Sequence, residues 1–276
     1  MNYHQYFFEC ITEQQKEILI ALLSDAGCEG FEEDDKKLYA YSPEEITTPT
    51  INKILEQVPV VYSQKVIKEE NWNALWESGF NPVTVFYPDS DKKFTSIRAD
   101  FHPPDTTAQF DILINPKMSF GTGHHATTYG MVQSMSTLDF KNKDVIDFGT
   151  GTGILSILAE KRGATHVIAI DHDDLCIQNA FENFNRNECK NIRLIKDKIL
   201  IPVIKADIIL ANINLNVIIE NIESILSVCK PQTTILLSGI YLEDAITVNT
   251  ILKKYAQSAS VVYKNNNWIV LQIIYT

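Results

Sequence analysis

In residues 1–68, segments with the apolar spacing of a strand take turns with segments that have the apolar spacing of a helix. Strands are predicted at residues 3–11, 28–33, 37–41 and 61–68. Between them, apolar residues recur at helical spacing after the N-cap Thr12 and again over residues 50–58. The order strand, helix, strand, strand, helix, strand is the ferredoxin-like pattern. We therefore expect residues 1–68 to form a small α+β domain.

A single helix is predicted to connect this domain to the rest of the chain. In residues 69–81, Trp72, Trp76 and Phe80 are spaced so that all three share one face of a helix. Pro82 ends the helix. We interpret the aromatic face as a packing seam between domains in preference to a ligand site.

The remaining residues, 82–276, begin with strands and then alternate between helices and strands. The first strands are predicted near residues 83–87, 94–102 and 111–115. Further strands are predicted at residues 144–148, 166–170, 192–196, 207–211, 233–238, 259–263 and 268–275. Helices are predicted at residues 124–137, 153–162, 174–187, 216–229 and 242–255. This alternation predicts an α/β fold, a Rossmann-like seven-stranded sheet with helices on both faces and a closing antiparallel hairpin.

The chain is acidic, and its charge is concentrated near the N-terminus. The formal net charge is −11, and residues 1–60 carry twelve acidic and four basic side chains. An acidic protein is poorly suited to a phosphate backbone, so we expect no direct nucleic-acid binding. Residues 32–35, all acidic, form either a solvated face or a docking surface for a basic partner.

Composition favours a two-domain protein of the cytoplasm. The chain has 276 residues, of which 45% are hydrophobic. No apolar run approaches the roughly 20 residues that a membrane span needs, and no signal peptide is recognised. The five cysteines are scattered without metal-ligand spacing, which is typical of free thiols in a reducing compartment. We expect a monomer without a membrane segment or a bound metal.

A glycine-rich loop follows the strand predicted at residues 144–148 and opens the next helix. Gly149, Gly151 and Gly153 permit a tight turn and let a ligand approach the backbone where a Cβ would clash. Asp171 ends the next strand, 22 residues after Gly149, where a carboxylate is placed to accept both hydroxyls of a ribose. Together they predict a site for a nucleoside-containing cofactor.

The spacing of the glycines favours S-adenosyl-L-methionine over a dinucleotide. The dinucleotide fingerprint is G-x-G-x-x-G, whereas here the glycines run G-x-G-x-G and Ile154 takes the last position of that fingerprint. Asp147 adds negative charge near the loop, which suits a cationic sulfonium better than a diphosphate. A carboxylate that only braces the loop is the alternative for Asp147, and NAD(P) is the alternative cofactor.

A second glycine-containing stretch precedes the first helix of the α/β region. We expect it to fold over the cofactor, although a plain connector is the alternative. Its candidate cofactor contacts are Phe120 against the adenosyl or methionine part, Thr122, and Thr128 near the carboxylate. The neighbours His124 and His125 have no acidic or thiol residue near them in sequence, so we do not expect a metal there.

The strand predicted at residues 207–211 leads into Asn212. In an open parallel sheet, ligands bind beyond the carboxyl ends of the strands, so Asn212 is expected in the same crevice as Gly149 and Asp171. Its amide can orient a substrate amine or hold the methionine part. A polar residue that merely ends a strand is the alternative.

At these residues the sequence resembles the bacterial ribosomal protein L11 methyltransferases. The matching positions are residues 72–77, 120–123, 125, 127–128, 147–155, 171, 211–212 and 238–240. The most specific part is the string Phe-Gly-Thr-Gly-x-His-x-Thr-Thr over residues 120–128, which general methyltransferases lack. The chain departs from the family at His124 (usually Thr), at Ala126 (usually Pro) and in the run Ile-Asn-Leu-Asn after Asn212.

The resemblance implies a protein N-methyltransferase that uses S-adenosyl-L-methionine. It implies transfer to the N-terminal α-amine and to lysine side chains of a basic ribosomal protein, with residues 1–68 as substrate-recognition domain and 82–276 as catalytic domain. No catalytic base is expected, because desolvation beside a sulfonium favours the neutral amine. The rivals are a methyltransferase for another protein or a small molecule, an NAD(P) oxidoreductase, and a non-catalytic cofactor-binding module.

Overall fold

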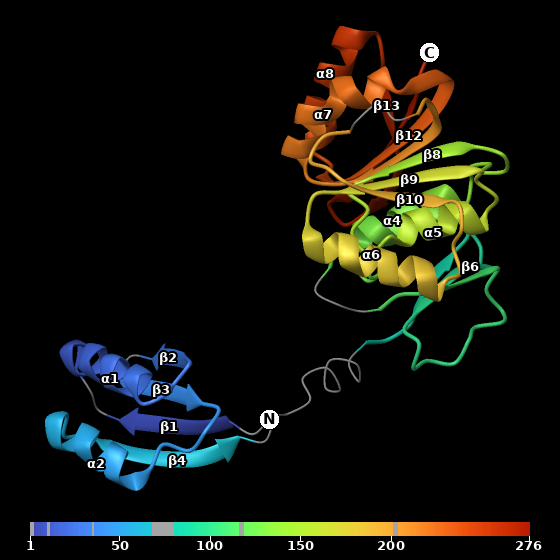
Figure 1. Cartoon of the computed structure of the whole chain (residues 1–276). Helices are drawn as coiled ribbons and strands as arrows, with labels where there is room; N and C mark the ends of the chain where they lie inside the picture. The colour runs from blue at the N-terminus through green and yellow to red at the C-terminus, as the bar shows by residue number, and fades with distance from the viewer. Residues whose placement is uncertain (1–2, 10–11, 35, 68–79, 116–118, 201–203) are drawn as a thin grey trace. The chain divides into compact units, whose positions relative to one another are not determined.

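The chain divides into two compact units, Met1–Gly79 and Phe80–Thr276. The computed structural model describes the whole chain except residues 1–2, 10–11, 35, 68–79, 116–118 and 201–203 (Figure 1). The helix predicted at residues 69–81 lies almost entirely outside the described residues. Each unit is therefore considered by itself.

The N-terminal unit is an antiparallel sheet covered by two helices. Its elements are β1 (Tyr3–Glu9), α1 (Glu13–Asp25), β2 (Gly30–Asp34), β3 (Lys37–Ser42), α2 (Thr48–Gln57) and β4 (Val61–Ile67). The strand order β2-β3-β1-β4 confirms the predicted ferredoxin-like fold. Thr12 caps α1 in a capping box with Gln15, as its sequence position predicts. Alternate residues of β1, such as Tyr6 and Phe8, are fully buried against the helices.

The second unit is built on a seven-stranded sheet. Its strands are β8 (Asp144–Phe148), β9 (His166–Asp171), β10 (Ile192–Lys196), β11 (Ala206–Asn212), β12 (Cys229–Tyr241), β13 (Ala259–Asn265) and β14 (Trp268–Ile274). The order is β10-β9-β8-β11-β12-β14-β13, and the first five strands are parallel. The chain reverses its direction of travel between β8 and β11, which is where open α/β sheets bind ligands. β14 runs antiparallel to both of its neighbours.

Helices cover both faces of this sheet (Figure 1). They are α4 (Ala126–Met135), α5 (Ile154–Lys161), α6 (Asp174–Arg186), α7 (Leu215–Ser227) and α8 (Asp244–Leu252). Successive buried residues of a strand enter opposite core layers: Ile209 belongs to the layer that includes residues of α7 and α8, and Leu210 to the layer that includes residues of α4, α5 and α6. None of the helices within the described residues is long and apolar enough to cross a membrane.

A small three-stranded sheet precedes α4 in the sequence. It consists of β5 (Val83–Phe86), β6 (Lys93–Arg98) and β7 (Phe110–Leu113). The prediction of a strand at residues 94–102 is wrong for the second half of that range, because β6 ends at Arg98. The guanidinium of Arg98 donates to the carbonyl of His102 (2.7 Å), and the His102 amide donates to Ala99 O (3.1 Å), which closes a turn there.

The layered core gives a stability prediction. Leu210 is fully buried at the centre of the sheet, so Leu210→Ala is expected to lower the free energy of unfolding by about 2–5 kcal/mol. Ile246→Ala is the matched control, because Ile246 is 75% exposed on α8 and its loss should cost less than about 0.5 kcal/mol. Urea unfolding of both variants checks this. Equal losses would contradict the assigned core.

Candidate functional site

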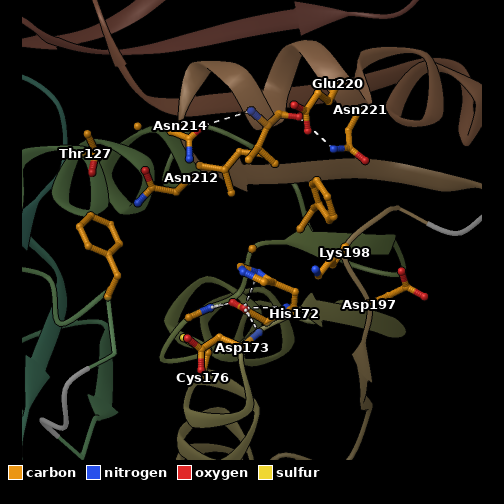
Figure 2. A pocket seen from close by; sticks show the side chains of 18 of the residues that line it. Thr127, His172, Asp173, Cys176, Asp197, Lys198, Asn212, Asn214, Glu220 and Asn221 are labelled. Atoms are coloured by element: carbon orange, nitrogen blue, oxygen red, sulfur yellow. Dashed lines mark hydrogen bonds and ion pairs between the residues drawn. The ribbon is translucent and has the colours of Figure 1, made fainter.

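A cavity of about 590 Å³ opens at the carboxyl edge of the seven-stranded sheet (Figure 2). Its walls come from the strand ends, the loops that follow them, α6, α7 and the segment before α4. The lining residues are Phe120, His125, Thr127, Phe148, Gly149, Gly151, Asp171, His172, Asp173, Cys176, Asp197, Lys198, Asn212, Ile213, Asn214, Val217, Glu220, Asn221, Gly239 and Trp268. Figure 2 shows Asn212 and Asn214 on one side and His172, Asp173 and Cys176 on the other.

The glycine loop forms one wall of the cavity, and its close packing is possible only because its glycines have no side chains. Gly149 and Gly151 both have positive φ, +77° and +56°. A Cβ on Gly149 would lie 2.2 Å from Cγ2 of Ile213, and one on Gly151 would lie 2.4 Å from the carbonyl oxygen of Phe120. The loop is therefore pressed against two other segments of the site, and both glycines line the cavity as predicted.

The carboxylate of Asp171 organises the edge of the cavity and faces into it. Its Oδ2 accepts from the Gly151 amide (2.9 Å), and its Oδ1 accepts from the amides of His172 (2.8 Å) and Asp173 (3.1 Å). A carboxylate has about four acceptor positions, so capacity remains for a ligand hydroxyl. The structure thus places Asp171 as the sequence predicts, beside the glycine loop.

Asp147 braces the loop and is not among the residues that line the cavity. Its Oδ2 accepts from the hydroxyls of Thr150 and Ser156, both at 2.6 Å, and from the Ser156 amide at 3.2 Å. The side chain is fully buried, and this burial raises its pKa from about 3.8 to about 6. The carboxylate thus braces the loop, which is the alternative given for it, and its bearing on the choice of cofactor stays a prediction. Spacing alone does not reveal to which side a carboxylate turns.

Asn212 ends β11 and lines the cavity. Its Nδ2 donates to Oγ1 of Thr128 (3.3 Å), whereas its buried Oδ1 has no partner among the described residues. The Ile213 amide donates to Ser238 O (3.1 Å), which fixes the turn after the strand. Asn214, a departure from the family pattern, caps α7 by accepting from the Val217 amide (3.1 Å).

Of the cofactor contacts predicted at and before the start of α4, one lines the cavity and two do not. Phe120 lines the cavity and is 52% exposed. Thr122 instead contacts the His124 ring (3.3 Å) and is not among the lining residues. Thr128 is buried behind Asn212 and also lies outside the lining, so its contact with the cavity is indirect. His125 lines the cavity and caps α4 by accepting from the Thr127 amide (3.3 Å).

Sequence reasoning missed two kinds of residue. Asp197 follows β10 and lines the cavity. The rule that identified Asp171 at the end of β9 would also have found it. Trp268 begins β14, and nothing in its local sequence marks it; only the pairing of β14 with β12 brings it to the cavity. Within the described part of the chain, no group of three or more His, Cys, Asp or Glu side chains is arranged to hold a metal ion.

Comparison with known proteins places this geometry in a family. The family model described as "Ribosomal protein L11 methyltransferase (PrmA)" matches residues 4–275. The ribosomal protein L11 methyltransferase of Porphyromonas gingivalis is 35% identical over 288 residues, covering 99% of this chain and 97% of the relative. That of Chlorobaculum tepidum is 36% identical over 282 residues, covering 97% and 95%. The crystal structure of a ribosomal protein L11 methylase from Lactobacillus delbrueckii subsp. bulgaricus matches with a TM-score of 0.60 at 28% identity, covering 70% of this chain and 99% of that one.

The buried carboxylate of Asp147 predicts a pH dependence of stability. Its pKa is higher in the folded state than in the unfolded chain, so the folded state binds the extra proton between about pH 4 and pH 6. Stability from this group is present below about pH 4 and falls by about 3 kcal/mol as the pH rises through about 6. Asp147→Asn keeps an acceptor for Thr150 and Ser156 and removes this titration.

Urea unfolding at several pH values measures the effect. The free energy of unfolding of the wild type minus that of Asp147→Asn should decrease as the pH rises from 4 to 6 and then level off. Asp174→Asn serves as the control, because its carboxylate is 80% exposed. Parallel pH profiles for the wild type and Asp147→Asn would contradict the assigned burial.

Proposed function

The chain belongs to the ribosomal protein L11 methyltransferase family, and we propose that it methylates amines of ribosomal protein L11 with S-adenosylmethionine. The acceptors are the N-terminal α-amine and lysine side chains. The observation that carries the proposal is that Asp171 and Asn212, a carboxylate and an amide at the ends of two strands, line one cavity.

The cavity fits S-adenosylmethionine on its own geometry. Asp171 has acceptor capacity for the ribose hydroxyls, and Gly149 and Gly151 line the cavity with backbone that the methionine part can approach. Asp197, at the next strand end, offers a carboxylate toward the adenine end of the cavity. Phe120 provides an exposed aromatic face. When bound, the sulfonium supplies an activated methyl group.

The residues near Asn212 orient the acceptor amine. Because Nδ2 of Asn212 is committed to Thr128, its Oδ1 is the atom available to accept an N–H from the amine. This contact aims the nitrogen lone pair away from Asn212, toward the methyl donor. Positioning of this kind accounts for a large part of the rate in a bimolecular displacement.

The site favours the neutral amine without a base. A lysine amine has a reference pKa of about 10.4 and must lose its proton before it reacts. The described lining residues on β11, β12 and β14 are an amide, glycine backbone and an aromatic ring, and α7 adds the carboxylate of Glu220. Desolvation next to a cationic sulfonium lowers the amine's pKa, and the proton leaves to solvent.

The N-terminal unit is the proposed substrate-recognition domain. Its acidic character complements a basic ribosomal protein, and Glu32 is held on its sheet by the hydroxyl of Tyr41 (2.9 Å). We propose that residues 1–68 recognise the substrate, that residues 82–276 catalyse the transfer, and that the protein acts in the cytoplasm as a monomer without direct contact to nucleic acid. The four described cysteines without a disulfide suit that compartment.

The central test uses unmodified ribosomal protein L11 from the same organism. Incubation with the enzyme and S-adenosylmethionine should give a ladder of methyl-sized increments in intact-protein mass spectrometry. Asp171→Ala should weaken cofactor binding about ten- to a hundred-fold in calorimetry, because a charge-assisted contact is lost. Asp174→Ala, at an exposed neighbouring carboxylate, is the control and should leave cofactor binding unchanged.

The outcomes separate the substrate from the cofactor. Cofactor binding without any mass increment on L11 would overturn the substrate and redirect the search to other basic proteins or small molecules. Nicotinamide binding in place of S-adenosylmethionine would overturn the reaction itself.

Charge neutralisation tests the recognition surface. A variant in which residues 32–35 are changed to Gln, Gln, Asn and Asn should raise KM for L11 about three- to tenfold at low salt, because electrostatic attraction is lost. Its cofactor affinity should stay constant. The control removes four exposed charges from the other unit by the changes Asp89→Asn, Asp91→Asn, Glu188→Gln and Glu223→Gln. If both variants shift KM equally, residues 32–35 do not form the docking surface.

A further inference from the structure

Three aromatic rings adjoin one another beside the cavity. The Trp268 ring lies 4.7 Å from the His125 ring in an edge-on arrangement and 4.1 Å from the Tyr241 ring, centroid to centroid. Trp268 and His125 line the cavity, and Tyr241 is 41% exposed beside them. Phe120, 5.2 Å from His125, continues the rings toward the glycine loop. We refer to His125, Tyr241 and Trp268 as the aromatic wall.

The order of the strands places the aromatic wall beyond the methyl donor. Along the sheet, Asp171 ends β9, Gly149 follows β8, and Asn212 ends β11. Tyr241 ends β12, and its paired residue Trp268 begins β14. Trp268, on the second strand past β11, therefore lies on the side of Asn212 opposite Asp171. An acceptor side chain that reaches Asn212 from that side passes the wall.

The aromatic wall suits a cation that has lost its hydration. Aromatic faces attract alkylammonium groups, and the attraction grows when the cation is desolvated. Each added methyl replaces an N–H that water would bind, so a methylated amine loses less on leaving water than a primary ammonium does. The carboxylates of Glu243 and Asp244, which follow Tyr241 in the sequence, are engaged by other groups. These bind Nδ2 of Asn267 (3.1 Å) and the Tyr241 amide (2.8 Å).

We propose that the aromatic wall binds the acceptor nitrogen in its mono- and dimethylated states and retains it for further transfer to the same nitrogen. This rests on the proposed amine methylation. It assigns to Trp268 a positioning role that matters least for the first methyl transfer and more for the later ones. A primary amine is held by its N–H groups at Asn212. A methylated amine has fewer N–H groups to offer and depends more on the rings.

The chemistry of successive transfers explains why retention matters. In each step the nitrogen lone pair forms a bond to the methyl carbon while the carbon–sulfur bond breaks, and that electron pair stays on sulfur. The product ammonium must lose a proton to solvent before it reacts again, so it is a cation between transfers. After the third transfer to a lysine no N–H remains, and contact with Asn212 through a hydrogen bond has ended.

Product distributions test the proposal with the full-length enzyme. Trp268→Leu should lower the ratio of trimethylated to monomethylated product about three- to thirtyfold at matched extent of first transfer, as the strength of such contacts implies. Trp268→Phe keeps an aromatic face and should restore most of the ratio. Tyr241→Leu should lower it less. Peptide mapping by mass spectrometry reads each acceptor amine separately.

Tyr255→Leu is the matched control, because the exposed fraction of Tyr255 (39%) is similar to that of Tyr241 (41%). Tyr255 is not among the residues that line the cavity. It should leave the ratio unchanged. If Trp268→Leu slows all transfers to the same degree or leaves the ratio intact, the proposed role is overturned. Calorimetry with S-adenosylmethionine distinguishes this result from damage to the cofactor site.

Direct binding separates this proposal from the choice of substrate. The full chain saturated with S-adenosylhomocysteine is titrated with the amides of trimethyllysine and of lysine. Tighter binding of the trimethylated amide, lost in Trp268→Leu, supports the wall even when L11 is not methylated. Equal binding of the two amides overturns the wall even when L11 is methylated.

Discussion

The site depends on three segments that approach one another closely at glycines, where a Cβ would clash. The loop at Gly149 touches the side chain of Ile213, Gly151 touches the Phe120 carbonyl, and a Cβ on Gly239 would lie 2.4 Å from the Ile213 carbonyl. A further hydrogen bond from the Thr152 amide to Phe120 O (3.0 Å) joins the first segment to the second. This close contact sets the separation of the strand ends and therefore the separation of the groups that bind cofactor and acceptor.

The two halves of the cavity differ in electrostatic character. On the β9 and β10 side the described lining includes the carboxylates of Asp171, Asp173 and Asp197. On the β11 to β14 side it includes the amide of Asn212 and the ring of Trp268, together with the carboxylate of Glu220 on α7. In the proposed function, the hydroxyls of a nucleoside bind at the first end and the acceptor amine enters at the second, where the strand ends contribute no charge.

The sequence predicted most of the fold because hydrophobic period and strand-end chemistry are local signals. Both Asp171 and Asn212 follow apolar strands, and parallel strands bring such ends to one edge, so their meeting was predictable. The direction of Asp147 was not, since its partner Ser156 lies on the next helix and the choice between cavity and brace is made by packing. Trp268 was not predicted for another reason. Its position at the cavity depends on the long-range pairing of β14 with β12.

That antiparallel pairing has an evolutionary meaning. The cofactor-binding half comes from one stretch of chain, β8 to β10, whereas the far end of the cavity receives Trp268 from a C-terminal hairpin whose turn is exposed. On the proposed roles, the groups that meet the acceptor and those that meet the cofactor therefore lie on separate pieces of chain, so selection for a new substrate has a separate segment on which to act.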